Sequence, residues 1–118
     1  MPKSAVKSAT IYHNPKCTTS CNVLAMIEAA GVKPKVVEYL KAGWTKPQLK
    51  ALFAAAGVTP REAMRKKAAE DLGISEKATA APILDAMVEN PVLVERPFVE
   101  TSKGVRLCRP KDKVLEIL

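Results

Sequence analysis

The chain has 118 residues, of which 47% are hydrophobic and 26% are charged, and these values are ordinary for one globular domain. The apolar content is too high for a disordered chain, and the longest run without a polar side chain, residues 51–58, is far shorter than the roughly 20 residues that cross a membrane. The first ten residues carry positive charge but lack the apolar stretch of a secretion signal. Three cysteines do not make the even framework of a secreted disulfide scaffold, so we expect a cytoplasmic protein whose thiols are free, catalytic or metal-bound.

The formal net charge of +7 fits either a solvated basic surface or an anionic ligand. The few aromatic residues are scattered along the chain, which disfavours base stacking on nucleic acid. Three of the five arginines lie in the last quarter of the sequence. We therefore expect an anionic small molecule as ligand, no nucleic-acid or membrane partner, and a monomer.

The first third of the chain predicts a β-α-β unit. Residues 9–13 form a short β-rich run that Asn14-Pro15 closes with a turn. Apolar side chains then recur at helical spacing over residues 18–30, and residues 35–40 resemble a second strand. Two strands joined by a helix of this length favour parallel pairing.

The middle of the chain predicts helices. One runs from Thr45 to about residue 56, and Thr59 to Glu62 form a capping box with proline in the first turn. Arg65 would lie about one turn into that capped helix. Further helix is expected over residues 67–72 and 79–89.

The last quarter predicts extended structure. An extended run begins at about residues 92–95 and is interrupted by Arg96-Pro97. Residues 98–100 and 105–108 then have the alternation and the central turn of a β-hairpin.

A helix that begins at Pro110 closes the predicted fold. Its inward-facing residues are expected to be Val114, Leu115 and Leu118. The complete order of elements predicts an α/β fold, with a four-stranded mixed sheet flanked by helices. Without the helical insertion between strands two and three, at about residues 45–90, this is the thioredoxin-like order.

Cys17 lies at or just before the start of the first helix, where free N–H groups and the helix dipole favour a thiolate. The positive charge of Lys16 also favours the thiolate. The hydroxyls of Thr18, Thr19 and Ser20 could cap the helix or bind an oxyanion. A thiolate beside an anion site is what a thiol that attacks an oxyanion requires. The alternative is a buried cysteine that serves as a small apolar side chain.

The loop around Cys17 cannot neutralise a dianion alone. Cysteine phosphatase loops carry arginine six residues after the nucleophile, and this chain has Val23 there. The candidates for the missing positive charge are Arg65, Arg96 and Arg109, because a planar guanidinium binds tetrahedral oxyanions with paired hydrogen bonds. The alternative for these arginines is surface exposure or a structural ion pair.

Cys21 is a possible second thiol, because it lies one helical turn after Cys17. A disulfide between the two would require the first turn to unwind. The spacing of His13, Cys17 and Cys21 also raises a metal site, but three ligands on one element are too few for a closed zinc site, and we expect no metal. Cys108 follows the strand alternation and is expected to be a packed core residue.

Three separated motifs resemble those of glutaredoxin-coupled bacterial arsenate reductases. They are residues 11–20, which include His13, Cys17 and Ser20, residues 90–97, and residues 104–110. The resemblance covers about residues 8–118 and implies a single domain with the thioredoxin-like fold. Pro97 matches the cis-proline of that fold.

The resemblance implies a specific reaction. Cys17 matches the cysteine that attacks arsenate, after which glutathione attacks the adduct and glutaredoxin resolves the mixed disulfide. Arg65, Arg96 and Arg109 match the arginines that bind the oxyanion, and His13 matches a histidine that supports the low pKa of the thiol. Glutathione would be a co-substrate, with no bound cofactor.

Two alternatives remain open. One is a glutathione-dependent or dithiol redox protein of the same fold that does not act on arsenate. The other is a regulator that binds RNA polymerase, although such regulators usually carry Cys-x-x-Cys and this chain has Cys-x-x-x-Cys.

Overall fold

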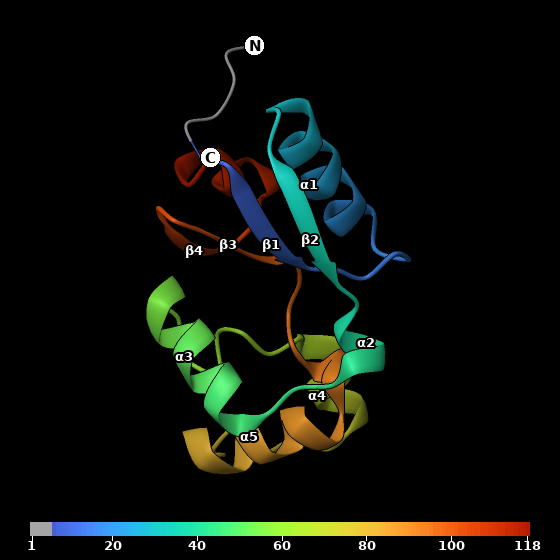
Figure 1. Ribbon diagram of the computed structural model, residues 1–118. Coiled ribbons are helices and arrows are strands. Elements are labelled where there is room, and N and C mark those ends of the chain that lie inside the picture. The colour runs from blue at the N-terminus through green and yellow to red at the C-terminus, as the bar shows by residue number, and fades with distance from the viewer. Residues whose placement is uncertain (1–5) are drawn as a thin grey trace. The chain divides into compact units, whose positions relative to one another are not determined.

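The computed structural model describes residues 6–118 (Figure 1). Residues 1–5, half of the amino-terminal segment considered above for a secretion signal, lie outside the described residues. Two compact units can be distinguished: a sheet unit that runs to Ala42 and resumes at Arg96, and a helical unit of residues 43–95. Across residues 6–118, no helix combines the length and the apolar character needed to cross a membrane. The description of residues 8–118 as one domain stays a prediction.

The sheet unit contains the predicted four-stranded mixed sheet, in the order β2-β1-β3-β4. The strands are β1 (Ser8–Tyr12), β2 (Lys33–Val37), β3 (Phe98–Thr101) and β4 (Gly104–Leu107). β1 and β2 are parallel and are connected by helix α1 (Thr18–Ala29), as the β-α-β pattern predicted. β3 is antiparallel to both β1 and β4. The predicted fold class is therefore confirmed.

Strand β2 starts and ends earlier than the predicted range of residues 35–40. Pro34 lies inside it, opposite Ala9. Proline has no N–H to donate, and an edge strand tolerates it because one side of such a strand has no partner strand. The chain then leaves the sheet, and Tyr39–Ala42 form the short helix α2.

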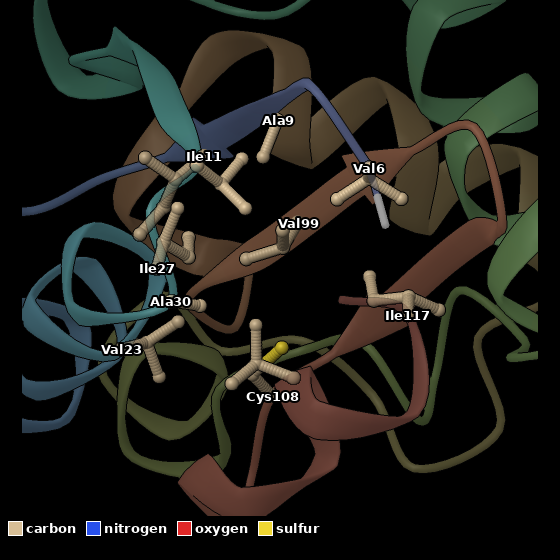
Figure 2. Packing of buried hydrophobic residues seen from close by; sticks show 11 residues of the cluster. Val6, Ala9, Ile11, Val23, Ile27, Ala30, Val99, Cys108 and Ile117 are labelled. Atoms are coloured by element: carbon tan, nitrogen blue, oxygen red, sulfur yellow. The ribbon is translucent and has the colours of Figure 1, made fainter. Parts of the chain in front are cut away.

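The core of the sheet unit lies between the sheet and two helical segments, α1 and the 3₁₀ helix η2 (Lys111–Glu116), which contact each other. Ile11 and Val99 face each other across β1 and β3 and belong to this core, as Figure 2 shows. Cys108 is packed in the same cluster and is fully buried, as predicted. The other principal members of the core are Val6, Ala9, Val23, Ile27, Ala30, Val32, Val114 and Ile117.

The closing segment is a 3₁₀ helix, and this changes which residues face inward. Val114 and Ile117 are fully buried, whereas Leu115 is 47% exposed. The prediction for Leu115 was wrong because a 3₁₀ helix has three residues per turn, so residues three apart share a face. An α-helical period would have placed Leu115 beside Val114 and Leu118.

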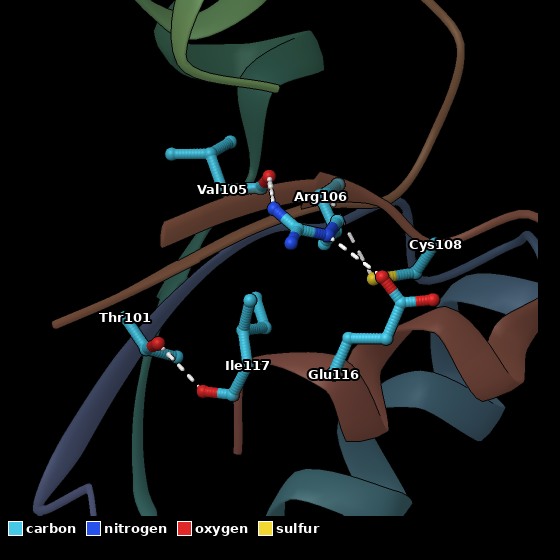
Figure 3. A network of polar contacts seen from close by, with 6 residues as sticks. All are labelled: Thr101, Val105, Arg106, Cys108, Glu116 and Ile117. Atoms are coloured by element: carbon cyan, nitrogen blue, oxygen red, sulfur yellow. Dashed lines mark hydrogen bonds and ion pairs between the residues drawn. The ribbon is translucent and has the colours of Figure 1, made fainter. Parts of the chain in front are cut away.

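Hydrogen bonds and an ion pair connect the closing segment to the β3–β4 hairpin (Figure 3). Thr101 Oγ1 donates to the carbonyl of Ile117 at 2.6 Å. The Arg106 Nε group donates to Glu116 Oε1 at 2.9 Å. These contacts hold η2 against the hairpin, and they place Ile117 over the core.

The helical unit contains α3 (Lys46–Ala56), α4 (Lys66–Asp71), α5 (Ala80–Glu89) and the 3₁₀ turn η1 (Pro91–Leu93). Three of the four helices predicted for the middle of the chain agree with α3, α4 and α5 to within one residue at each end. α3 begins with a capping box in which the Thr45 hydroxyl accepts from the N–H of the third helical residue. The apolar residues of α3, α5 and η1 provide most of the buried side chains of this unit.

The capping box at residues 59–62 forms, but it caps only a single turn. The Glu62 carboxylate accepts from the Thr59 N–H at 2.9 Å. Met64 then forms an isolated antiparallel bridge with Val94. Backbone groups used in this bridge cannot continue a helix, so the helix expected to contain Arg65 does not form.

The extended run expected to begin at residues 92–95 is shorter than predicted. Its first part belongs to η1, and only Val94 pairs with another segment. The Glu95 N–H donates to the carbonyl of Ala63 at 2.7 Å, which strengthens that contact.

Candidate active site

Cys17 is the N-cap residue of α1, with φ −97° and ψ 120°. In this extended conformation its sulfur lies at the first turn of the helix, where the N–H groups of Ser20 and Thr19 stabilise negative charge on it. The residue is only 9% exposed. The N–H groups of a first helical turn have no partner inside the helix, so they are available to an anion.

The surroundings of Cys17 favour its thiolate. Burial raises the pKa of the thiol, but the hydrogen bond from the Ser20 N–H, the hydrogen bond and positive charge of Arg96, and the Thr19 N–H together outweigh burial, so that the pKa lies below its ordinary value. A lowered pKa increases the fraction of nucleophilic thiolate at neutral pH. Cys17 thus combines burial with an environment that stabilises negative charge.

The imidazole of His13 is also buried, and its Nδ1 lies 2.6 Å from the hydroxyl of Ser20. Burial lowers the pKa of His13, and the charge of Glu38 only partly opposes this, so the ring is neutral at neutral pH. Because the backbone N–H of Ser20 favours the Cys17 thiolate, His13 can act on the sulfur through Ser20. The Ser20 hydroxyl, considered above as an oxyanion ligand, is fully buried and is engaged with His13.

Strand pairing brings Arg96 and Arg109 to the end of the sheet where Cys17 lies. Tyr12, at the end of β1, pairs with Phe98, at the start of antiparallel β3, so the residues after β1 and those before β3 lie at the same end. β4 ends opposite the same Phe98, and the Cys108 N–H donates to the carbonyl of Pro97 at 2.9 Å. The two arginines therefore meet, and Nη1 of Arg109 donates to the carbonyl of Arg96 at 3.0 Å.

Arg96 has unused donors. Its guanidinium forms a hydrogen bond with Cys17, but Nε and Nη1 are buried and have no hydrogen-bond partner among residues 6–118. Leaving a buried donor unpaired costs about 1–3 kcal/mol. These two N–H groups beside a thiolate are suited to bind the oxygens of an anion. The peptide bond between Arg96 and Pro97 is cis, as the resemblance implied, and so is that between Arg109 and Pro110.

Arg65 belongs to the helical unit and is the N-cap of α4 rather than a residue one turn inside a helix. Its Nε lies 3.6 Å from a carboxylate oxygen of Glu95, and its N–H donates to the carbonyl of Leu93 at 2.8 Å. This ion pair gives Arg65 a structural partner inside its own unit. Its part in oxyanion binding stays a prediction.

The remaining candidates differ in accessibility. Thr18 is exposed at the start of α1. Cys21 is exposed, and its thiol donates to the carbonyl of Pro15 at 3.3 Å. Burial raises the pKa of Cys108 to about 12, which makes its thiol unreactive. All three cysteines are free, and residues 6–118 contain no group of His, Cys, Asp and Glu side chains that could hold a metal ion.

Asn14 is a residue of the site that the sequence interpretation treated only as a turn former. It is 8% exposed, and it accepts hydrogen bonds from the backbone N–H groups of Lys16 and of Cys17 itself. The available signal was Asn before Pro, which is typical of a turn stabilised by the asparagine side chain.

Comparisons with known proteins identify the family of this chain. The model of the ArsC family matches residues 12–117. The arsenate reductase ArsI2 of Synechocystis sp. is 62% identical over 111 residues, which cover 92% of this chain and 79% of the relative. The arsenate reductase of Rhizobium meliloti is 50% identical over 114 residues, which cover 94% of this chain and 81% of the relative. The structure of the arsenate reductase from Vibrio cholerae superposes with a TM-score of 0.88 at 36% identity and covers 96% of this chain and 99% of that one. On the evidence of a match along nearly its whole length, this chain belongs to the ArsC family.

Proposed function

We propose that this protein is an arsenate reductase in which Cys17 is the nucleophile. The observation that carries the proposal is the pair of buried, unpartnered N–H groups of Arg96 next to a sulfur whose environment favours the thiolate. A tetrahedral oxyanion bound there would accept hydrogen bonds from this guanidinium and would present its central atom to Cys17. The names of the relatives support arsenate as that oxyanion.

The proposed reaction is a two-electron reduction by two thiols. The Cys17 thiolate attacks arsenic and forms a sulfur–arsenic bond, while one arsenic–oxygen bond breaks and the oxygen leaves as water after protonation. Glutathione then attacks this adduct. Arsenic passes from +5 to +3 and leaves as arsenite, and the two sulfur atoms form the mixed disulfide of Cys17 and glutathione. A thiolate of reduced glutaredoxin then attacks the glutathione sulfur of this disulfide, which forms a glutaredoxin–glutathione disulfide and releases the Cys17 thiolate.

The positive groups of the site have distinct parts in this reaction. Arg96 binds the oxyanion and stabilises the thiolate, and Arg109 supplies further charge from a position fixed by its hydrogen bond to the carbonyl of Arg96. Thr18 and Thr19 line the helix start at which the oxyanion binds. Arg65 is proposed as a third arginine of the site.

Glutathione is proposed as co-substrate and glutaredoxin as partner protein, in a monomeric enzyme of the cytoplasm. No tightly bound cofactor enters the proposed reaction, because both electrons come from thiols. Residues 8–118 are proposed to act as one domain.

The direct test is a coupled assay in which NADPH oxidation is followed with glutathione, glutathione reductase and glutaredoxin, with and without arsenate. We expect oxidation that depends on arsenate and disappears in Cys17→Ser. Cys108→Ser is the matched control, because that thiol is buried and unreactive. NADPH oxidation at the same rate without arsenate would contradict the proposal.

A dithiol redox protein of the same fold is the second candidate, because the exposed thiol of Cys21 lies one turn after Cys17. Cys21→Ser separates the two functions. The reductase should keep most of its arsenate-dependent activity in this variant, since glutathione supplies the second thiol. A Cys21→Ser variant as inactive as Cys17→Ser would favour the dithiol protein.

A further inference from the structure

Asn14 closes the loop between β1 and α1 with three hydrogen bonds. Its side-chain Oδ1 accepts from the N–H of Lys16 at 3.0 Å, and its carbonyl accepts from the N–H of Cys17 at 3.0 Å. Its own N–H donates to the hydroxyl of Ser20 at 3.1 Å. With Pro15 in the second position, this is a β-turn in which the asparagine side chain adds a second hydrogen bond to the backbone.

This turn determines the conformation of the nucleophile. The N–H of Cys17 is used by Asn14, and the residue enters α1 with extended backbone angles that direct its sulfur toward the helix start. Ser20, whose N–H favours the thiolate, is held in place by the hydrogen bond from the Asn14 N–H to its hydroxyl and by the contact of that hydroxyl with His13. Asn14 is thus bonded to the nucleophile and to one of the donors that stabilise its thiolate.

The chemistry of the side chain matters as well as its geometry. Serine, aspartate and asparagine can all form turns of this kind, because each offers a side-chain oxygen two residues before the N–H it binds. A carboxylate in this buried position would repel both a thiolate and an oxyanion at close range. An amide supplies the same acceptor without the charge.

We propose that Asn14 is a positioning residue for Cys17: its neutral side-chain oxygen holds the turn that presents the thiolate to its donors. The part of this inference that concerns the oxyanion rests on the proposed function. The part that concerns the thiolate does not, and it can be measured without arsenate.

The test is the pH dependence of alkylation by iodoacetamide. All variants carry Cys21→Ser, so that Cys17 is the one reactive thiol among residues 6–118, because Cys108 is fully buried and burial raises its pKa to about 12. Asn14→Ala removes the acceptor, and we expect the midpoint of its profile to move to higher pH and its rate at pH 6 to fall about tenfold, as the thiolate fraction falls tenfold for each unit of pKa. Asn14→Ser keeps an acceptor without charge and should alkylate nearly as the parent protein does.

Asn14→Asp separates geometry from charge. It keeps the acceptor, but we expect its midpoint to move to higher pH, because the added carboxylate is buried close to the thiolate, where salt screens charge only weakly. Asn22→Asp, which adds the same charge at an exposed position of α1, is the control and should alter the rate by less than twofold.

Thermal unfolding identifies the variants that are folded. If Asn14→Ala does not fold, the test compares the alkylation profiles of Asn14→Ser and Asn14→Asp with that of the parent protein. A parent-like profile in Asn14→Ala or in Asn14→Asp overturns the proposal. None of these outcomes depends on arsenate reduction, so failure of the reductase assay is distinguishable from failure of this inference.

Discussion

Replacing Arg96 by methionine tests whether its buried N–H groups serve an anion or the fold. Methionine has a similar length and no donor, so Arg96→Met removes the two unpartnered groups at Nε and Nη1. Each such group costs about 1–3 kcal/mol when it is left unpaired. Lost packing of the longer arginine side chain and the lost interaction with Cys17 offset part of that gain. We therefore expect the free energy of unfolding to stay constant or to rise by up to about 2 kcal/mol.

The same substitution should abolish stabilisation by the oxyanion. A ligand present at 100 times its dissociation constant stabilises the folded state by about 2.7 kcal/mol, which for a chain of this size raises the melting temperature by roughly 10 °C. The parent protein should show this increase with arsenate, and Arg96→Met should not. Arg96→Lys keeps the charge but loses the planar fork, so it should bind arsenate weakly and turn over slowly.

Urea unfolding at pH 7 gives the free energies, and thermal unfolding with and without arsenate gives the ligand effect. Arg109→Met is the matched control for stability, because Arg109 is exposed and one of its donors already has a protein partner. Two results would refute the reasoning. One is a loss of more than 2 kcal/mol in Arg96→Met, which would mean that the guanidinium supports the fold. The other is an equal melting increase with arsenate in the parent and the variant.

Three further predictions concern the sheet unit and α3. Ile117→Ala should lower the free energy of unfolding by about 2–5 kcal/mol in urea unfolding, and exposed Leu115→Ala by less than about 1 kcal/mol; equal losses would contradict the 3₁₀ register. Because the folded state lowers the pKa of Cys17, its thiolate contributes stability at high pH that is lost as the pH falls through the lowered pKa. The difference in unfolding free energy between the parent and Cys17→Ser should accordingly grow with pH up to the ordinary thiol pKa, and a constant difference would count against a stabilised thiolate. Thr45→Ala should cost about 1 kcal/mol in the same measurement through loss of the helix cap, and no change would mean that the capping box contributes nothing.

Local sequence patterns predicted the parts of the fold that depend on neighbouring residues. Helix α1 and the position of Cys17 at its start follow from the turn at Asn14 and from the apolar spacing that comes after it. Helix α3 follows from the Thr45 cap and from Gly57, whose positive φ of 71° ends the helix. These signals act within one or two turns of the chain, so they can be recognised without knowledge of the fold.

The errors occurred where a distant segment competes for the same backbone groups. The capped turn at residues 59–62 stops because Met64 pairs with Val94, which is 30 residues away. The closing segment forms a 3₁₀ helix that is held by Thr101 and Arg106 of the hairpin. As a result Ile117 is buried in the core, whereas Leu115 is exposed. The residues next to each segment in the sequence give no sign of these contacts with other parts of the chain.

The site likewise depends in part on neighbouring residues and in part on the folded sheet. Residues 13–20 carried enough local information to identify a cysteine in a position where its thiolate is favoured, because helix starts and turns are specified by adjacent side chains. The guanidinium of Arg96 reaches that sulfur only because β3 runs antiparallel to β1 with Phe98 opposite Tyr12, and Arg109 joins it because β4 ends opposite the same residue. Strand order and register depend on the whole core and not on the arginines, so the meeting of thiolate and guanidinium is a property of the folded sheet.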